Sequence, residues 1–193
     1  FDSYNGKMKR YNIITSRGCP QNCAFCANKL LNKRVWRAHS PEYVIEEIKH
    51  VIDMYKTRDF AIWDSNFSLD MKRAKKICDL LIEEKLDIRI SIPDGLRADR
   101  IDRELLEKLK LAGCHSISIG IEDGCPRTFP YINKGETLKQ IEDAVKLIKD
   151  VGINVRASMI IGAINATFES TMESIRFIKK LGIEAHWYLA IPF

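Results

Sequence analysis

The sequence has 193 residues, enough for one domain with a substantial core, and its 46% hydrophobic and 30% charged residues are the composition of a soluble globular protein. No stretch approaches the roughly 18 apolar residues of a membrane span, and the N-terminus lacks the apolar core of a signal peptide, so we expect a cytoplasmic protein without a membrane span. The net charge of +5 is modest and basic residues are interleaved with acidic ones, which does not favour a nucleic-acid partner.

Short β-type segments alternate with amphipathic helical segments along the chain. The pattern predicts strands over residues 11–15, 60–63, 88–92, 116–121, 155–161 and 185–191. It predicts helices after the Ser40-Pro41 pair and over residues 70–85, 102–111, 137–151 and 169–181. Three of these helices are followed by glycines suited to a helix end, Gly113, Gly152 and Gly182. Serial strand–helix units of this kind build an α/β fold with a parallel sheet, either doubly wound or closing into a barrel.

Polar residues follow the first four predicted strands. They are Cys19 to Cys26, the Asp64-Ser65-Asn66 turn, Asp94 to Arg97, and Glu122-Asp123-Gly124. Parallel barrels carry their chemistry on the loops after the strands. We therefore expect these four segments to meet at one site.

The first of these segments spaces Cys19, Cys23 and Cys26 as C-x3-C-x2-C. In a cytosolic chain, three close thiols favour metal or redox chemistry over a disulfide framework, which would leave one thiol unpaired. A zinc site normally has four ligands, and only His39 offers a weak fourth candidate. An iron–sulfur cluster suits soft thiolates, and three cysteines on four irons leave one iron open.

The remaining cysteines and one basic cluster have alternative interpretations. Cys78 and Cys114 fit the core, because a free cysteine usually behaves as a small buried hydrophobe, while Cys125 follows the Glu122 loop and could lie nearer the site. The cluster Lys29, Lys33, Arg34 and Arg37 suits either a solvated loop or a patch that steers a phosphate or substrate.

The cysteine segment resembles the signature of the radical S-adenosylmethionine (SAM) superfamily, with an aromatic residue before the third cysteine. The similarity extends along nearly the whole chain. The further motifs are Arg37-Ala38-His39-Ser40-Pro41-Glu42, Asp64-Ser65-Asn66-Phe67, Gly120-Ile121-Glu122 and Lys134-Gly135-Glu136, and they look like the class B-like subgroup that often carries a cobalamin-binding domain. The resemblance implies a partial (β/α)6 TIM-like barrel, a [4Fe–4S] cluster, SAM and possible use of cobalamin bound outside this chain.

The resemblance also implies a set of site residues. Cys19, Cys23 and Cys26 would ligate iron, and Phe25 would pack near the adenine of SAM. Contacts to SAM would come from Asp64 as preferred acceptor of its amino group, from Asn66, from Glu122 at the ribose or methionine part, and from Ser91 and Arg97 at its polar ends. Asp64 and Asn66 also suit a plain turn, Glu122 a solvated strand end, and Arg97 a surface pair with Asp94 or Asp99. His186 and Trp187 are candidates to face substrate.

The activity that follows is reductive cleavage of SAM to a 5′-deoxyadenosyl radical, with a flavodoxin or ferredoxin as reducing partner and methylation or related chemistry on an unidentified substrate. The alternatives are a [4Fe–4S] electron-transfer or sensing module and a zinc-stapled binding domain. The turn Gly162-Ala163-Ile164-Asn165-Ala166-Thr167 departs from the Gly-Leu-Pro-Gly-Glu turn of relatives, so the role of that glutamate is not carried over. We expect residues 1–10 to lead in from a missing N-terminal domain and residues 11–193 to be a barrel truncated after Pro192-Phe193.

Overall fold

The structure is a computed structural model that describes residues 3, 4 and 7–191. Its main sheet has the strand order β10-β9-β8-β7-β6-β3. These strands are β3 (Tyr11–Ile13), β6 (Asp59–Ile62), β7 (Arg89–Leu96), β8 (Cys114–Glu122), β9 (Asn154–Ile161) and β10 (Glu184–Leu189). The main helices are α2 (Pro41–Tyr55), α3 (Met71–Glu83), α4 (Arg103–Leu111), α5 (Leu138–Asp150) and α6 (Phe168–Leu181). The smaller elements are β1 (Ser3–Tyr4), β2 (Lys7–Met8), β4 (Ser16–Arg17), α1 (Asn28–Asn32), β5 (Arg37–Ala38) and the 3-10 helices η1 (Ala98–Arg100) and η2 (Phe129–Ile132).

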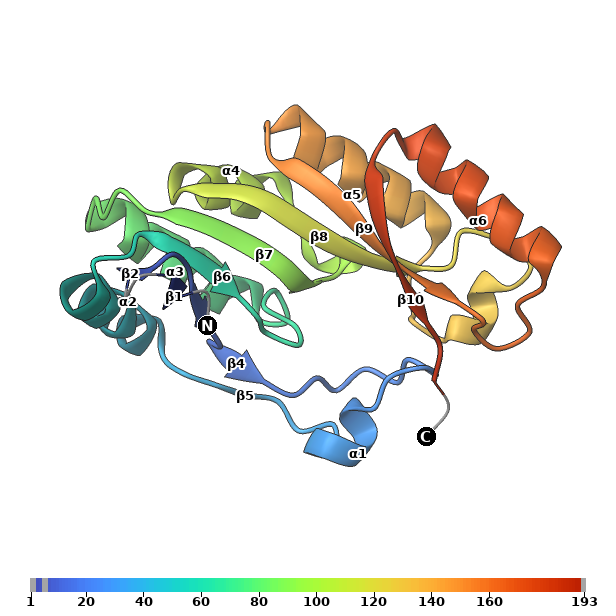
Figure 1. Ribbon diagram of the computed structural model, residues 1–193, viewed down its shortest axis with the longest axis horizontal. Coiled ribbons are helices and arrows are strands. Elements are labelled where there is room, and N and C mark those ends of the chain that lie inside the picture. Colours follow the sequence, from blue (N-terminus) through green and yellow to red (C-terminus); the bar gives the residue numbers. More distant parts are fainter. Residues whose placement is uncertain (1–2, 5–6, 192–193) are drawn as a thin grey trace.

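All neighbouring strands of the main sheet are parallel. Their order in space follows their order in the chain, so each helical crossover moves the chain by one strand in the same direction (Figure 1). Within the described residues β3 and β10 are the two edges and do not pair with each other, so the sheet curls into an open barrel. The predicted α/β fold, a partial (β/α)6 barrel of parallel strands, is confirmed.

The two faces of this sheet differ in chemistry because successive side chains of a strand point to opposite sides. The outer face carries large aliphatic and aromatic residues, such as Phe60, Ile90 and Ile117, which pack against the helices in one core. The inner face carries mainly small or polar residues beside Ile160 and Tyr188, and the hydroxyls of Ser118 on β8 and Ser158 on β9 lie 3.2 Å apart there. A closed barrel normally fills its interior with branched apolar residues. Here the inner face is instead a polar wall.

The helix starts follow from local side-chain chemistry. Ser40 caps α2 by accepting a hydrogen bond from the Tyr43 amide at 3.2 Å, and Pro41 occupies the first helical position, as predicted. Asp70 and Asp102 cap α3 and α4 in the same way. Thr137 begins α5 with a capping box, in which its side chain and that of Gln140 bond each other's backbone amides.

Some predicted boundaries were wrong. The third predicted strand was to stop at Pro93, but β7 continues to Leu96, because Pro93 lies where the pairing of β7 with β8 shifts register and no ladder bond needs its missing N–H. The first predicted strand ends at Ile13 rather than residue 15, and the last ends at Leu189 rather than residue 191. Part of the expected lead-in segment, and the expected cut after Pro192-Phe193, lie outside the described residues.

Candidate functional site

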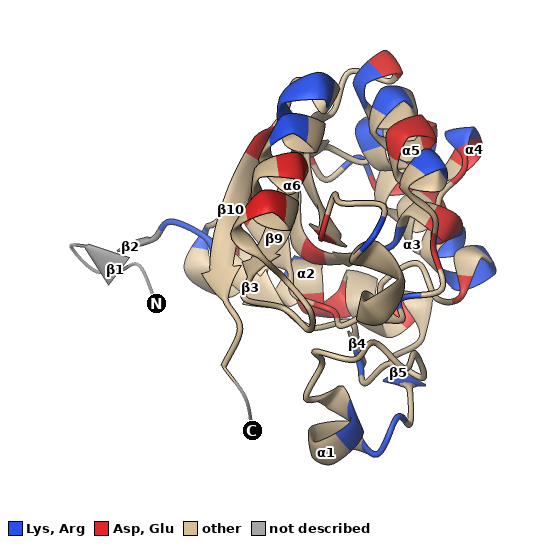
Figure 2. Ribbon diagram, turned by 90° about the vertical axis from the view of Figure 1, so that its right-hand side faces the viewer, with Lys and Arg blue, Asp and Glu red and all other residues tan. Residues whose placement is uncertain are grey.

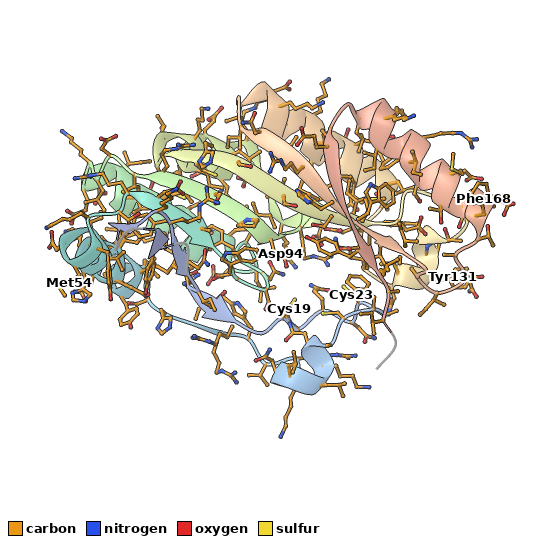
Figure 3. The ribbon with its side chains drawn as sticks, viewed as in Figure 1. Cys19, Cys23, Met54, Asp94, Tyr131 and Phe168 are labelled. Atoms are coloured by element: carbon orange, nitrogen blue, oxygen red, sulfur yellow. The ribbon has the colours of Figure 1, made fainter. Side chains whose placement is uncertain are left out.

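A cavity of about 500 Å³ lies at the carboxyl ends of β7, β8 and β9, under the loop that carries the three cysteines. Its wall includes Cys19, Cys23 and Cys26 on one side and Asp94, Arg97, Glu122 and Lys134 on the other. Figure 3 shows Cys19 and Cys23 on the segment between β4 and α1, below Asp94 at the end of β7. The four polar segments predicted to meet at one edge therefore contribute to one site.

The cysteine loop begins at a glycine that its geometry requires. Gly18 has φ +84°, and a Cβ at this position would lie 2.0 Å from the Val35 carbonyl oxygen, so no larger residue fits. Further along, the Ala24 amide donates to the Ile132 carbonyl at 2.9 Å and the Asn133 side chain donates to the Asn22 carbonyl at 3.0 Å. These bonds hold the loop against the end of η2.

The three loop thiols fit a multi-iron cluster. All three are free; Cys19 and Cys23 are half-buried and Cys26 is exposed. Among the described residues, no group of three His, Cys, Asp or Glu side chains gathers tightly enough to hold a single metal ion. A four-coordinate zinc site draws its ligands to one point, whereas in a cluster each cysteine binds a different iron. The donor set is three free thiols that line one cavity, and soft sulfur ligands of this kind suit an iron–sulfur cluster.

Asp64, predicted to meet SAM, has a different position. Its carboxylate is 1% exposed and accepts three hydrogen bonds of 2.6 Å, from the Thr15 amide, the Thr15 hydroxyl and the Ser16 hydroxyl. The buried Arg73 guanidinium donates to the carbonyl oxygens of Thr15 and His39, each at 2.8 Å. The Asp64 carboxylate is therefore occupied in fixing the chain where it enters the cysteine loop, and it does not line the cavity.

Asn66, two residues on, lies next to the first cysteine. Its side-chain amide is fully buried and its Nδ2 lies 3.7 Å from the Cys19 sulfur. Its Oδ1 has no hydrogen-bond partner among the described residues. A buried acceptor without a partner is costly, so this atom is a place where a bound donor would be stabilised.

Glu122 faces the cavity from an unusual backbone conformation at the end of β8. Its φ is +70°, and the pairing of β8 with β9 shifts register between Gly120 and Glu122, a bulge that redirects the side chain. A Cβ on Gly120 would lie 2.3 Å from the Glu122 Oε1, so this glycine makes the space for the carboxylate. Burial raises the pKa of Glu122, against the lowering effect of Lys134.

Lys134 joins Glu122 to a buried charge network. Its ammonium donates to the Gly120 carbonyl oxygen and lies 3.5 Å from Glu122 and 3.3 Å from Glu136. Arg97 pairs with Asp99 at 2.9 Å and donates to the Lys134 carbonyl oxygen at 2.7 Å. Burial likewise raises the pKa of Asp94 on the same wall and of the Cys23 thiol opposite, where Lys134 and Arg97 act in the other direction.

Two of the three guanidinium nitrogens of Arg97 make hydrogen bonds within the described residues. Nε and Nη2 bind Asp99 and the chain at Lys134, while Nη1 makes no hydrogen bond within the described part of the chain. Its pairing is with Asp99 rather than Asp94, one of the two possibilities that the sequence left open. The residue lines the cavity, so a planar cationic donor is held at its wall.

Several predicted residues lie away from this cavity. Ser91 donates to the Phe60 carbonyl oxygen at 3.4 Å and lines a second cavity of about 910 Å³ on the polar wall, together with His186. Trp187 packs against the core. Cys125 is buried and its thiol donates to Glu173 on α6 at 3.0 Å, away from the loop thiols. Phe25 does line the first cavity.

Cys78 and Cys114 behave as the sequence predicted. Both are buried in the core, and burial raises the pKa of each thiol to about 12. The residues missed as site members are Lys134 and Tyr188, whereas Asp94 stood in a segment expected at the site and was given no role there. Lys134 stood in a motif that had been noted, but only the fold brings it beside Glu122.

Comparison with known proteins defines the class. The family model described as the Radical SAM superfamily matches residues 13–178. The chain belongs to this superfamily, as its cysteine spacing indicated, and membership implies a [4Fe–4S] cluster and SAM as cofactors.

Individual relatives and solved structures show which radical SAM proteins this chain resembles. An uncharacterized methyltransferase of Pyrococcus horikoshii is 38% identical over 94% of this chain and 39% of its own length. The radical SAM methyltransferase TsrM of Kitasatospora setae, solved with tryptophan and a SAM analogue, superposes with a TM-score of 0.83 over 94% of this chain and 36% of that one, at 18% identity. The cobalamin-dependent SAM radical enzyme OxsB, solved with aqua-cobalamin and SAM, gives a TM-score of 0.72 over 86% and 26%, at 25% identity. The chain thus spans less than half of the length of each of these proteins. The predicted resemblance to the cobalamin-associated subgroup is confirmed.

Proposed function

We propose that the protein containing this chain reductively cleaves SAM at a [4Fe–4S] cluster held by Cys19, Cys23 and Cys26, and uses the product in a cobalamin-assisted methylation or a related reaction. One observation carries this proposal. The three free thiols of one loop face a cavity whose opposite wall holds a buried carboxylate and two buried cations, Glu122, Arg97 and Lys134. That wall matches a zwitterionic ligand with an ammonium, a carboxylate and a ribose.

Each residue then has a defined task. A bound cluster, once reduced by an external donor, would supply the single electron needed to split a carbon–sulfur bond of SAM to a 5′-deoxyadenosyl radical and methionine. Glu122 accepts a hydrogen bond from the ribose or the ammonium, and the free Nη1 of Arg97 meets the carboxylate. Asn66 offers its unpartnered Oδ1 beside Cys19, and Phe25 covers the adenine. Asp64 acts as a positioning residue that fixes the start of the loop.

The polar wall gives the substrate its place. Ser91, Ser118, Arg156 and His186 line the second cavity, which shares Trp63, Pro93 and Tyr188 with the first. A substrate seated there would present a carbon or heteroatom to the radical. Methyl transfer is the favoured outcome, because a 38% identical relative carries that name.

The setting of the reaction follows from its chemistry. Cleavage needs a one-electron donor, for which a flavodoxin or ferredoxin is suited. The thiols must stay reduced, which favours the cytoplasm as its location. Within the described residues, no helix combines the length and the hydrophobicity of a membrane span.

The test is SAM cleavage by the anaerobically reconstituted full-length protein reduced with dithionite. We expect brown protein and release of 5′-deoxyadenosine, detected by mass spectrometry. The variant Cys23→Ala should lose the cluster and the product, whereas Cys78→Ala, a matched change in the core, should keep both. A protein that binds the cluster but never cleaves SAM would instead be an electron-transfer or sensing module, and colourless protein with zinc would be a binding domain. Cobalamin use is tested separately, by the transfer of a deuterated methyl group with and without added methylcobalamin.

A further inference from the structure

The segment that carries the cysteines differs in charge from the rest of the chain. From Ser16 to Pro41 the sequence contains Arg17, Lys29, Lys33, Arg34 and Arg37 and no acidic residue, although the whole chain carries 26 Asp and Glu. Figure 2 shows basic colouring along β5 and the segment after α1. We call these five residues the basic patch.

The cations of this patch lack the carboxylate partners that cations elsewhere have. On the helices, Lys75 pairs with Asp102 at 2.7 Å and Lys180 pairs with Glu142 at 2.6 Å. Within the described part of the chain, no member of the basic patch forms an ion pair; Arg34 donates only to the neutral Asn22 side chain.

The patch also brings like charges together. Arg17 and Arg37 lie directly opposite each other in the antiparallel pairing of β4 with β5. Facing cations destabilise a strand pair, so this arrangement opposes folding and suits an external anion.

Exposed apolar side chains lie among these cations. Leu30 is 65% exposed, Leu31 77% and Val35 49%, all on or just after α1. Protein-binding surfaces often combine an apolar centre with a charged rim. A solvated loop explains the lysines alone, but it does not explain two exposed leucines side by side.

The surface is adjacent to the cluster ligands. Lys29 follows Cys26 by three residues, which limits their Cα separation to about 11 Å. Cys26 is the exposed thiol of the three, and Leu31 lines the cavity that the cysteines face. A protein bound here would be next to the cluster, at a place where electrons can enter without displacing SAM from the opposite wall.

We propose that the basic patch, together with Leu30, Leu31 and Val35, is the docking surface for an acidic one-electron carrier protein. This inference rests on the proposed function, which requires such a donor. One electron leaves the reduced carrier, which becomes oxidised, and enters the cluster; no bond forms or breaks at the surface. Charge complementarity favours the encounter and makes it sensitive to salt.

The test measures binding and electron delivery separately. The double variant Lys29→Glu/Lys33→Glu is compared with Lys139→Glu/Lys146→Glu, which makes the same change in net charge on α5, in the outer helical layer. Titration calorimetry of the cluster-loaded full-length protein with an acidic flavodoxin should show a dissociation constant that rises by about 10- to 100-fold in the first variant and less than about twofold in the second. For wild type, binding should weaken steeply between about 0.05 and about 0.5 M salt, because the electrostatic screening length shortens over this range.

Activity assays then distinguish failure of the docking proposal from failure of the proposed function. With flavodoxin as donor, Lys29→Glu/Lys33→Glu should form 5′-deoxyadenosine more slowly, while with dithionite it should match wild type; Lys29→Arg/Lys33→Arg should restore the flavodoxin rate. Equal flavodoxin affinity for wild type and the Glu variant would overturn the docking proposal. A second result would also overturn it: wild type binds anionic phospholipid vesicles or single-stranded DNA but not flavodoxin, and the Glu variant loses that binding. Absence of dithionite-driven cleavage in wild type would contradict the proposed function alone.

Discussion

The sheet with its helices and the cysteine loop are built on different principles. In the sheet, residues such as Phe60, Ile117 and Leu106 are completely buried, and side chains cap the long helices. In the loop, α1 has five residues, its N-cap Ala27 makes no capping bond, and its leucines are exposed. The barrel therefore has its own source of stability, whereas the loop depends on a few polar anchors and on the cofactor that it holds. The difference shows that the scaffold is stabilised by buried side chains and helix caps, which the cysteine loop largely lacks.

The largest expected contrast is in thiol reactivity. In metal-free folded protein at pH 8, iodoacetamide should label Cys19 and Cys26 at least roughly a thousand times faster than Cys78 and Cys114. Burial raises the pKa of both core thiols to about 12, which leaves roughly one in ten thousand as thiolate at that pH. Peptide mapping by mass spectrometry measures the rates, and in urea all the thiols should react alike. Rapid labelling of Cys78 in the folded protein would remove the contrast.

A pair of identical substitutions tests the same difference in stability. Leu106→Ala should lower the free energy of unfolding by about 2–5 kcal/mol, because the side chain is completely buried. Leu30→Ala should change it by less than about 0.5 kcal/mol, because that leucine is 65% exposed. Urea denaturation of both variants is the measurement. Similar losses would show that α1 is part of the core.

The anchor at the base of the loop should have an intermediate effect. Asp64→Asn keeps the shape of the side chain but weakens three hydrogen bonds to Thr15 and Ser16, so we expect a loss of about 1–3 kcal/mol. Asp143→Asn, which removes an exposed ion pair with Lys139, is the matched control and should cost less than about 0.5 kcal/mol. Asp64→Asn should also reduce the iron bound on reconstitution. Full stability in this variant would show that Asp64 does not anchor the loop.

The smallest effect concerns a helix cap. Thr137→Ala should remove the capping box of α5 and lower the free energy of unfolding by about 1 kcal/mol, without changing cluster binding. Denaturant unfolding and iron content are measured together. A change in iron content would contradict this expectation and would show that the start of α5 influences the cysteine loop.

Features that depend on neighbouring residues in the chain could be predicted from the sequence, whereas features that depend on distant contacts could not. The cap at Ser40 and the helix starts at Asp102 and Thr137 are set by neighbours in the chain, and the structure reproduces them. The course of β7 through Pro93 depends on its register with β8, which no local pattern shows.

The site residues divide in the same way. The family resemblance assigned Asp64 to SAM, yet its hydrogen-bond partners Thr15 and Ser16 are almost fifty positions earlier in the chain. Lys134 was overlooked because its place beside Glu122 arises from the bulge after Gly120. The residue types indicated the chemistry of the site. Contacts between residues far apart in the chain determine which of these side chains face the cavity.

The unpaired edge at β10 has a practical consequence. An edge strand presents free backbone N–H and C=O groups to any other extended chain, and here Tyr188 is 57% exposed, Leu189 74% and Ile191 78%. Natural proteins usually protect such edges with charge, proline or a covering segment. We therefore expect this chain to self-associate through β10 at high concentration, which size-exclusion chromatography over a concentration series would measure. A soluble preparation therefore calls for a partner strand over that edge or for lysines at its outward positions.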